Sequence, residues 1–113
     1  CGGNRDKAKR PIMAKIATEL SDKTILTSDN PRNEDPEQII NEMEQGVEAQ
    51  NFKKSLSITD RKQAIKTACQ LAQPNDIILI AGKGHETYQE IQGARYDFDD
   101  MKTVTELLIQ LNK

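Results

Sequence analysis

Residues 76–81 (DIILIA) restrict the possible folds more than any other part of this sequence. Every position after Asp76 is apolar, and the run of five apolar residues has the length of a strand. Such a run is typical of a strand inside a parallel sheet, because helices cover both faces of a parallel sheet. We therefore predict that residues 76–81 form a strand that is buried on both faces.

Helix and strand patterns alternate through the rest of the chain, which predicts β–α–β crossovers and a three-layer αβα sandwich with a mostly parallel sheet. We expect this α/β fold to be a single domain over residues 1–113, a common size for one core. In the first half we expect a loop, a helix over 11–21, a strand over 23–28, a helix from 36 to 44 or 45 and a strand over 55–58. The next helix is expected to be capped by Thr59 or Asp60 and to end at Pro74-Asn75, before the strand over 76–81. A hairpin-like excursion over 91–98, which turns at Gln92-Gly93, and a last helix capped by Asp99 complete the expected order.

The chain begins Cys-Gly-Gly, without an initiator methionine or a signal peptide. In an α/β protein a glycine-rich loop normally follows a strand, and there is no room for one before Gly2. We therefore expect the chain to be part of a longer protein whose preceding strand ends at Cys1.

Composition and charge argue against several classes of function. Its 16 basic and 18 acidic residues are mixed, and only two tyrosines and two phenylalanines could stack on bases, so we expect no nucleic-acid binding. The longest apolar run is far below the roughly 20 residues that span a bilayer, so we expect no membrane insertion. Two distant cysteines and one histidine indicate neither a disulfide framework nor a zinc site, and a reducing cytoplasm is the simpler location.

Three polar loops are expected at the carboxyl ends of strands, the edge where ligands bind in open α/β sheets. The first loop covers residues 1–10, the second loop 29–35 and the third loop 82–86. Taken singly, each is open to a reading as ordinary turn chemistry or as a binding site. If the preceding strand exists, all three converge on one edge, and together they form the candidate site.

The side chains of these loops suit a zwitterion. Arg5 and Arg32 can each hold a carboxylate through paired hydrogen bonds, and Asn30 can donate and accept beside them. Glu86 and the Gly82 carbonyl can accept from an ammonium group. We therefore predict an amino-acid site with one arginine left for a second acidic group.

Asp29, Lys83 and His85 are further candidates in the same loops. Glycines on both sides of Lys83 indicate close approach of the backbone, whereas a lone histidine is more often structural than catalytic. The glycine spacing matches neither GxGxxG nor a Walker pattern, and no nucleophile has a base beside it. We therefore expect no catalytic residue, no metal site and no independent nucleotide-binding site in this chain.

At these loops the sequence resembles the Mur ligase family, in particular the members that add diaminopimelate to a peptidoglycan precursor. The resemblance rests on GGNRDKAKRPIMAKIA, TSDNPRNEDP, Asp60-Arg61 and AGKGHETYQ, in this order and over essentially the whole chain. It implies the C-terminal, Rossmann-like domain of a larger enzyme, which presents the incoming amino acid. The family's motifs imply that meso-diaminopimelate is held by Arg5, Asn30, Arg32, Gly82 and Glu86.

The resemblance also implies that the full-length enzyme uses ATP and Mg²⁺, held by upstream N-terminal UDP-binding and central ATPase domains. ATP would phosphorylate the carboxylate of UDP-MurNAc-L-Ala-D-Glu, and the amine of the amino acid would attack the resulting acyl phosphate. The family's residues for ATP and Mg²⁺ all lie upstream of Cys1. We therefore expect these 113 residues alone to bind neither cofactor and to be inactive, and we expect the protein to be a monomer.

Arg32 is the residue expected to select the amino acid. Meso-diaminopimelate carries a second carboxylate that lysine lacks, and lysine-adding relatives usually lack this arginine. Three alternatives stay open: a ligase of the same family that adds L-lysine or another amino acid, a non-catalytic α/β binding module, and a structural or interaction domain.

Overall fold

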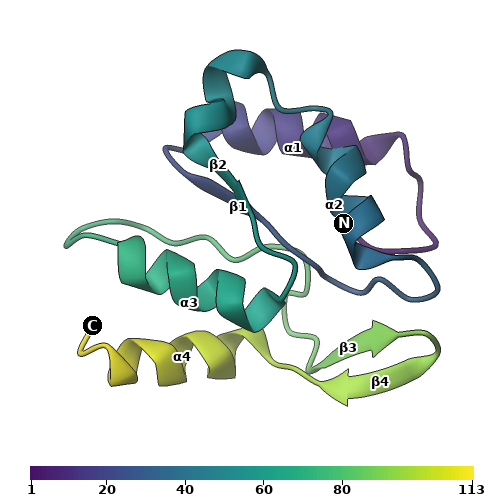
Figure 1. Cartoon of the computed structure of the whole chain (residues 1–113). Helices are drawn as coiled ribbons and strands as arrows, with labels where there is room; N and C mark the ends of the chain where they lie inside the picture. Colours follow the sequence, from purple (N-terminus) through teal and green to yellow (C-terminus); the bar gives the residue numbers. More distant parts are fainter.

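The computed structural model describes all 113 residues, and its elements form three layers (Figure 1). The elements are α1 (Lys9–Leu20), β1 (Thr24–Leu26), α2 (Pro36–Glu44), a 3-10 helix η1 (Ala49–Lys54), β2 (Ser55–Ser57), α3 (Arg61–Leu71), β3 (Tyr88–Ile91), β4 (Ala94–Asp97) and α4 (Asp100–Gln110). Strands β1 and β2 pair in parallel, with α1 and α2 on one side and α3 and α4 on the other. The predicted three-layer α/β arrangement is confirmed.

Local capping explains where three of the helices begin. The side chains of Asp35, Asp60 and Asp99 accept hydrogen bonds from backbone N–H groups in the first turns of α2, α3 and α4. Each bond satisfies a donor that the helix itself leaves without a partner. The caps expected at Asp60 and Asp99 are therefore confirmed.

The excursion expected after the third loop is an antiparallel hairpin of β3 and β4. It turns at Gln92-Gly93, as predicted, and both residues have positive φ, 49° and 79°. This backbone twist suits a two-residue hairpin turn. The hairpin begins at Tyr88 rather than at Ile91, so it extends closer to the third loop than the sequence indicated.

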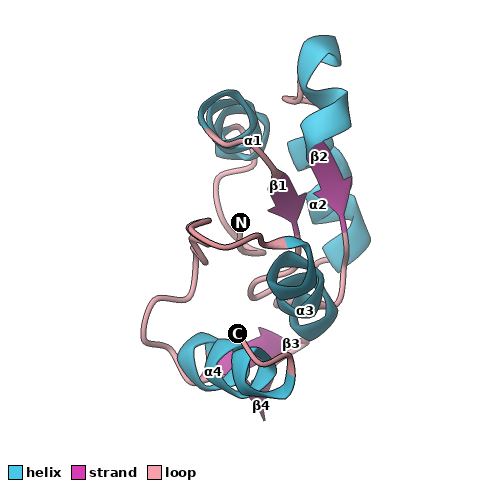
Figure 2. Ribbon diagram, turned by 90° about the vertical axis from the view of Figure 1, so that its left-hand side faces the viewer, coloured by secondary structure: helices cyan, strands magenta, loops and turns pink.

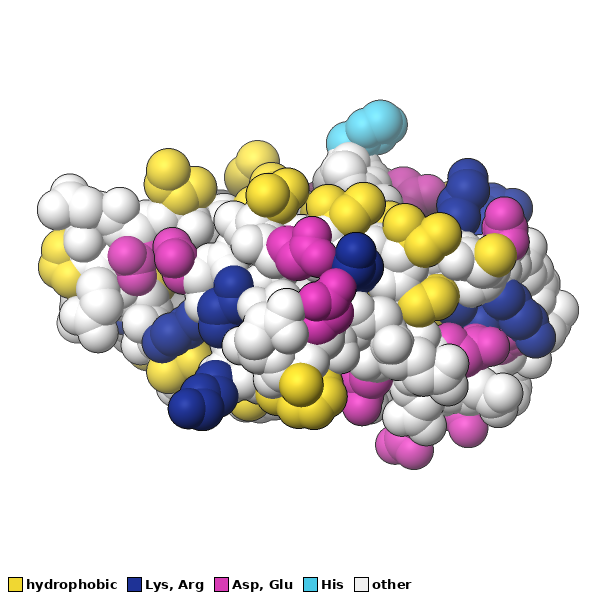
Figure 3. All heavy atoms as spheres, turned by 90° about the horizontal axis from the view of Figure 1, so that it is seen from above, with side chains coloured by type: hydrophobic (Ala, Val, Ile, Leu, Met, Phe, Trp, Pro, Cys, Tyr) yellow, Lys and Arg dark blue, Asp and Glu magenta, His cyan; other side chains and the backbone are white.

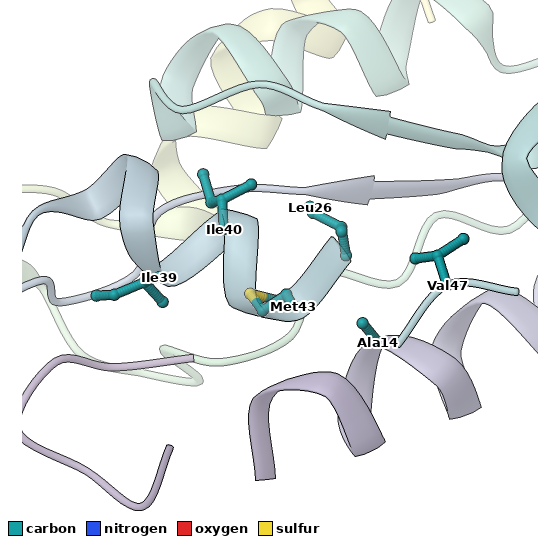
Figure 4. Packing of buried hydrophobic residues seen from close by; sticks show 6 residues of the cluster. All are labelled: Ala14, Leu26, Ile39, Ile40, Met43 and Val47. Carbon is teal, nitrogen blue, oxygen red and sulfur yellow. The ribbon is translucent and has the colours of Figure 1, made fainter. Parts of the chain in front are cut away.

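Two apolar clusters make up the core, one on each side of the sheet. Six residues pack between α1, α2 and β1 and fix these elements together (Figure 4): Ala14, Leu26, Ile39, Ile40, Met43 and Val47. The second cluster lies between α3 and α4 and is built on Ile65, Cys69 and Leu107. The two clusters hold the carboxyl end of β1 between them, and the second loop follows that end.

Helix α1 leaves most of its apolar side chains in solvent. Ile12, Met13, Ile16 and Leu20 have the spacing of one helix face, yet all are exposed. Figure 3 shows hydrophobic side chains spread across this side of the molecule. The buried positions are instead Arg10, Ala14 and Thr18, spaced by four residues. No helix of the structure is both long and apolar enough to cross a membrane.

The strand predicted over residues 76–81 is not formed. The backbone groups of residues 77–80 make no hydrogen bond, and Figure 2 shows the segment as a loop on the side of β1 away from β2. Ile77 and Leu79 are 95% and 86% exposed, whereas Ile78 and Ile80 pack against the second cluster. Burial on both faces was therefore wrong for this structure: one face is half-buried and the other is exposed. No neighbouring strand pairs with the backbone, because β1 pairs only with β2.

Candidate functional site

The three loops meet at the carboxyl end of β1. The Gly3 N–H donates to the Asn30 carbonyl over 2.7 Å, and Arg32 Nη1 donates to the Gly3 carbonyl over 2.9 Å, which joins the first loop to the second. Lys83 Nζ donates to Asn30 Oδ1 over 2.7 Å, which joins the third loop to the second. The predicted convergence of the loops is confirmed by these contacts.

Strand β3 holds Arg32 in an unusual backbone conformation. Arg32 has a φ of 52°, in the left-handed region that only a few per cent of non-glycine residues adopt. Its N–H donates to the Glu90 carbonyl over 2.9 Å, and its carbonyl accepts from the Gln92 N–H over 2.6 Å. These two hydrogen bonds fix the backbone from which the guanidinium extends, so the hairpin is part of the site.

Part of the Arg32 guanidinium is bound to other groups of the chain, and part is free. Nη1 donates to the Gly3 carbonyl, and Nε lies 3.5 Å from a carboxylate oxygen of Glu90. Nη2 makes no hydrogen bond, and the side chain keeps part of its surface exposed. Arg32 can therefore offer a charged donor edge to an incoming carboxylate. The role of Glu90 was not predictable, because it depends on the pairing of the hairpin with the second loop.

Asn30 and Glu86 lie side by side. The Asn30 side chain is buried, and its Nδ2 donates to Glu86 Oε1 over 3.4 Å. The Tyr88 hydroxyl donates to the other Glu86 oxygen over 3.4 Å. Both bonds are long, so the half-buried Glu86 carboxylate remains able to accept from an ammonium group at short range.

Of the remaining predicted residues, Arg5, Gly82 and His85 are exposed and Lys83 is buried. Arg5 and His85 are exposed and make no hydrogen bond or ion pair, and Figure 3 shows the histidine standing out from the surface. Gly82 is exposed with a φ of 116°, and a Cβ there would lie 3.2 Å from an Asp29 carboxylate oxygen. Lys83 is buried, with Nζ 3.1 Å from the Asp29 carboxylate. The structure thus brings Asn30, Arg32 and Glu86 into one group, with Gly82 at its edge, and leaves Arg5 and His85 in solvent.

The buried Arg10 links the first loop to the second. It was not identified as a site residue from the sequence. Arg10 donates to the Gly2 carbonyl in the first loop and to the carboxylate of Glu34 in the second, at 3.0 and 2.9 Å. It also pairs with Glu42 on α2. The spacing of Arg10, Ala14 and Thr18 by four residues was the only available signal, since it places the arginine on the buried stripe of α1.

The ion pair of Arg10 and Glu34 predicts a dependence of stability on pH. The hydrogen bond from Arg10, followed by that from the Asn4 N–H, lowers the pKa of Glu34 from 4.5 to about 2. Because the unfolded state binds the extra proton, this contribution is complete above pH 4.5 and is lost as the pH falls to about 2. Between pH 5 and 2, the urea midpoint should fall more steeply for the unaltered protein than for Glu34→Gln. The exposed Glu106→Gln is the control, and equal slopes for the unaltered protein and Glu34→Gln would contradict the prediction.

Comparison with known proteins gives a consistent result. The family model described as "Mur ligase, glutamate ligase domain" matches residues 1–84. A protein of Cytophaga hutchinsonii is 63% identical over 113 residues, and one of Bacteroides thetaiotaomicron is 60% identical over 106. Both relatives are named UDP-N-acetylmuramoyl-L-alanyl-D-glutamate--2,6-diaminopimelate ligase.

A solved structure of a ligase with the same name agrees over the whole chain, with a TM-score of 0.92 and 48% identity. This chain spans less than a quarter of the length of the two relatives. The matches include 100% and 94% of this chain for the two relatives, but only 23% and 22% of the relatives' own length. The solved structure is likewise covered to 23%.

Proposed function

Because this chain belongs to the Mur ligase family, we propose that it is the amino-acid-binding domain of a ligase that adds meso-diaminopimelate to UDP-MurNAc-L-Ala-D-Glu. One observation carries the proposal: Asn30 of the second loop contacts Glu86 of the third loop through its side chain and Arg32 through its carbonyl, so the three residues form one group. The names of the relatives support it, since each describes a ligase that acts with diaminopimelate.

The chemistry of the site fits an amino acid with two charged ends. The guanidinium of Arg32 would hold a carboxylate, with Asn30 Nδ2 as a second donor. Glu86 and the Gly82 carbonyl would accept from an ammonium group at the same end of the molecule. Arg5, which has no partner within the chain, would be free to close on the other carboxylate.

In this proposal the chain binds and orients the nucleophile. The amine of the amino acid would attack the carbonyl carbon of an acyl phosphate and form a C–N bond. Phosphate would leave with the electrons of the broken C–O bond, and the nitrogen would lose a proton to water. Orientation alone can lower the barrier of such a step substantially, because two reactants are held at fixed positions. ATP would supply the phosphoryl group that activates the acceptor's carboxylate.

ATP and Mg²⁺ are expected to be held upstream of this chain. No three His, Cys, Asp or Glu side chains gather in a metal-binding arrangement here, and Arg10 and Lys83 are engaged with protein groups. Sites for both cofactors, and the UDP-binding and ATPase domains, stay predictions for the full-length enzyme. The inactivity of the 113 residues alone, a monomeric state and a cytoplasmic location stay predictions as well.

Replacing Arg32 with alanine in the full-length ligase tests the proposed function. We expect kcat/KM for meso-diaminopimelate to fall on the order of 100-fold while that for L-lysine changes little, because the lost partner serves the second carboxylate. Lys66→Ala is the control, since Lys66 is exposed on α3 and makes no hydrogen bond or ion pair.

Each other result has a distinct meaning. An unchanged preference for diaminopimelate in Arg32→Ala would show that another residue selects the amino acid. A preference of the unaltered enzyme for L-lysine would support the alternative ligase. Failure of the unaltered protein to bind any amino acid, measured by calorimetry, would favour a non-catalytic module.

A further inference from the structure

Lys83 is the most completely buried charged side chain of the candidate site, with a side-chain exposure of 0%. Its ammonium donates to Asn30 Oδ1 over 2.7 Å and to the Tyr88 carbonyl over 2.9 Å, and it lies 3.1 Å from the Asp29 carboxylate. Two oxygen atoms of the second loop and one of β3 therefore surround the ammonium. Nothing of the ammonium remains for a ligand.

These contacts determine which way the Asn30 carboxamide points. Oδ1 accepts from Lys83 Nζ and also from the Glu90 N–H over 2.9 Å, so both of its lone pairs are used. Nδ2 consequently points the other way, toward Glu86 Oε1. A flipped amide would place NH2 against two donors and its oxygen against a carboxylate, and each of these three contacts is repulsive.

We propose that Lys83 is a positioning residue, which holds the Asn30 carboxamide so that Nδ2 is presented to the carboxylate of the bound amino acid. This inference rests on the proposed function, because it assumes an amino acid at Asn30. Lys83 acts through Asn30 and does not touch the substrate. The third loop thus contributes to specificity twice, directly through Glu86 and indirectly through Lys83.

A lysine suits this task better than a neutral donor. Its positive charge strengthens the bond to Oδ1 and is offset by Asp29, so the buried ion is paired and hydrogen-bonded. The same ammonium joins the second loop to the start of β3 through the Tyr88 carbonyl. Removing it leaves only the Glu90 N–H and the Glu86 carboxylate to orient the amide.

The test uses Lys83→Met, Asn30→Asp and the double variant in the full-length ligase. We expect Lys83→Met to raise the Kd for meso-diaminopimelate, measured by calorimetry, about 10-fold or more, with the KM for ATP unchanged. Asn30→Asp replaces Nδ2 by an oxygen that repels the carboxylate, and should weaken binding about 100-fold. Lys62→Met, at an exposed position of α3, is the matched control.

Coupling between the two substitutions separates positioning from general loosening of the structure. If Lys83 acts through the Asn30 amide, the double variant binds no more weakly than Asn30→Asp alone. Additive losses would overturn the proposal, and so would an unchanged Kd in Lys83→Met.

Two further outcomes are distinguishable. If Lys83→Met does not fold, the test depends on Asn30→Asp, which keeps an oxygen acceptor for Lys83. If Asn30→Asp binds meso-diaminopimelate as tightly as the unaltered enzyme does, the proposal is overturned. If the unaltered enzyme binds no diaminopimelate, both the proposed function and this inference fail. Binding by the unaltered enzyme with no effect of Lys83→Met rejects the inference alone.

Discussion

Replacing Arg61 with methionine is expected to lower the free energy of unfolding by about 3–5 kcal/mol. Arg61 is buried, and two of its nitrogens donate to the Asp100 carboxylate at 2.8 and 2.6 Å. It also donates to the carbonyls of Ser28 and Ala81, at 3.1 Å each. Methionine fills part of the same space but leaves Asp100 as a buried charge without a partner. Urea denaturation of both proteins at neutral pH measures the difference.

The double variant Arg61→Met, Asp100→Leu is the control for this prediction. A buried ion pair is costly to break and far less costly to replace by two apolar residues of similar size. We therefore expect the double variant to be more stable than Arg61→Met. A loss below about 1 kcal/mol for the single variant would show that Asp100 is reached by water. Because Ser28 and Ala81 precede the second and third loops, amino-acid binding should weaken in parallel.

Replacing Gly3 with alanine is expected to separate the first loop from the second. A Cβ at Gly3 would lie 1.8 Å from the Pro31 carbonyl oxygen, and this obstacle is backbone rather than a flexible side chain. The loop must move, and the Gly3–Asn30 and Arg32–Gly3 hydrogen bonds are lost. We expect a loss of about 2–4 kcal/mol in the free energy of unfolding. Binding of meso-diaminopimelate to the full-length ligase should fall on the order of 100-fold, because Arg32 loses its support.

Gly84→Ala is the matched control for Gly3→Ala. Gly84 has a φ of 57°, but a Cβ there meets nothing within 4 Å. Its cost is therefore only that of a left-handed backbone, about 1–2 kcal/mol. Gly3 has no positive φ, so its cost is purely one of space. Equal effects of the two substitutions would contradict the steric explanation, and urea denaturation of both variants makes the comparison.

Features set by neighbouring residues were predictable from the sequence. The caps at Asp60 and Asp99 and the turn at Gln92-Gly93 depend on a few consecutive positions, and all three are present. The meeting of the three loops followed from the alternation of helices and strands. That Asn30, Arg32 and Glu86 would carry the chemistry is a prediction whose geometry now supports it.

Features set by distant residues were not predictable. Whether residues 76–81 form a strand depends on a partner for their backbone, and local apolar character says nothing about that partner. The buried ends of Arg61 and Lys83 are similar cases, since each is held in part by acceptors 20 or more residues away. A lone basic residue in a sequence is normally read as exposed, so the burial of both side chains was not predictable.

The unpaired backbone of residues 77–80 has a practical consequence for the isolated chain. A row of free N–H and C=O groups flanked by the exposed Ile77 and Leu79 is a template on which another extended polypeptide can add. Concentrated preparations of these 113 residues are therefore at risk of association through this edge. Because Ile77 and Leu79 already face water, a lysine at either position would act as a gatekeeper against association and leave both apolar clusters intact.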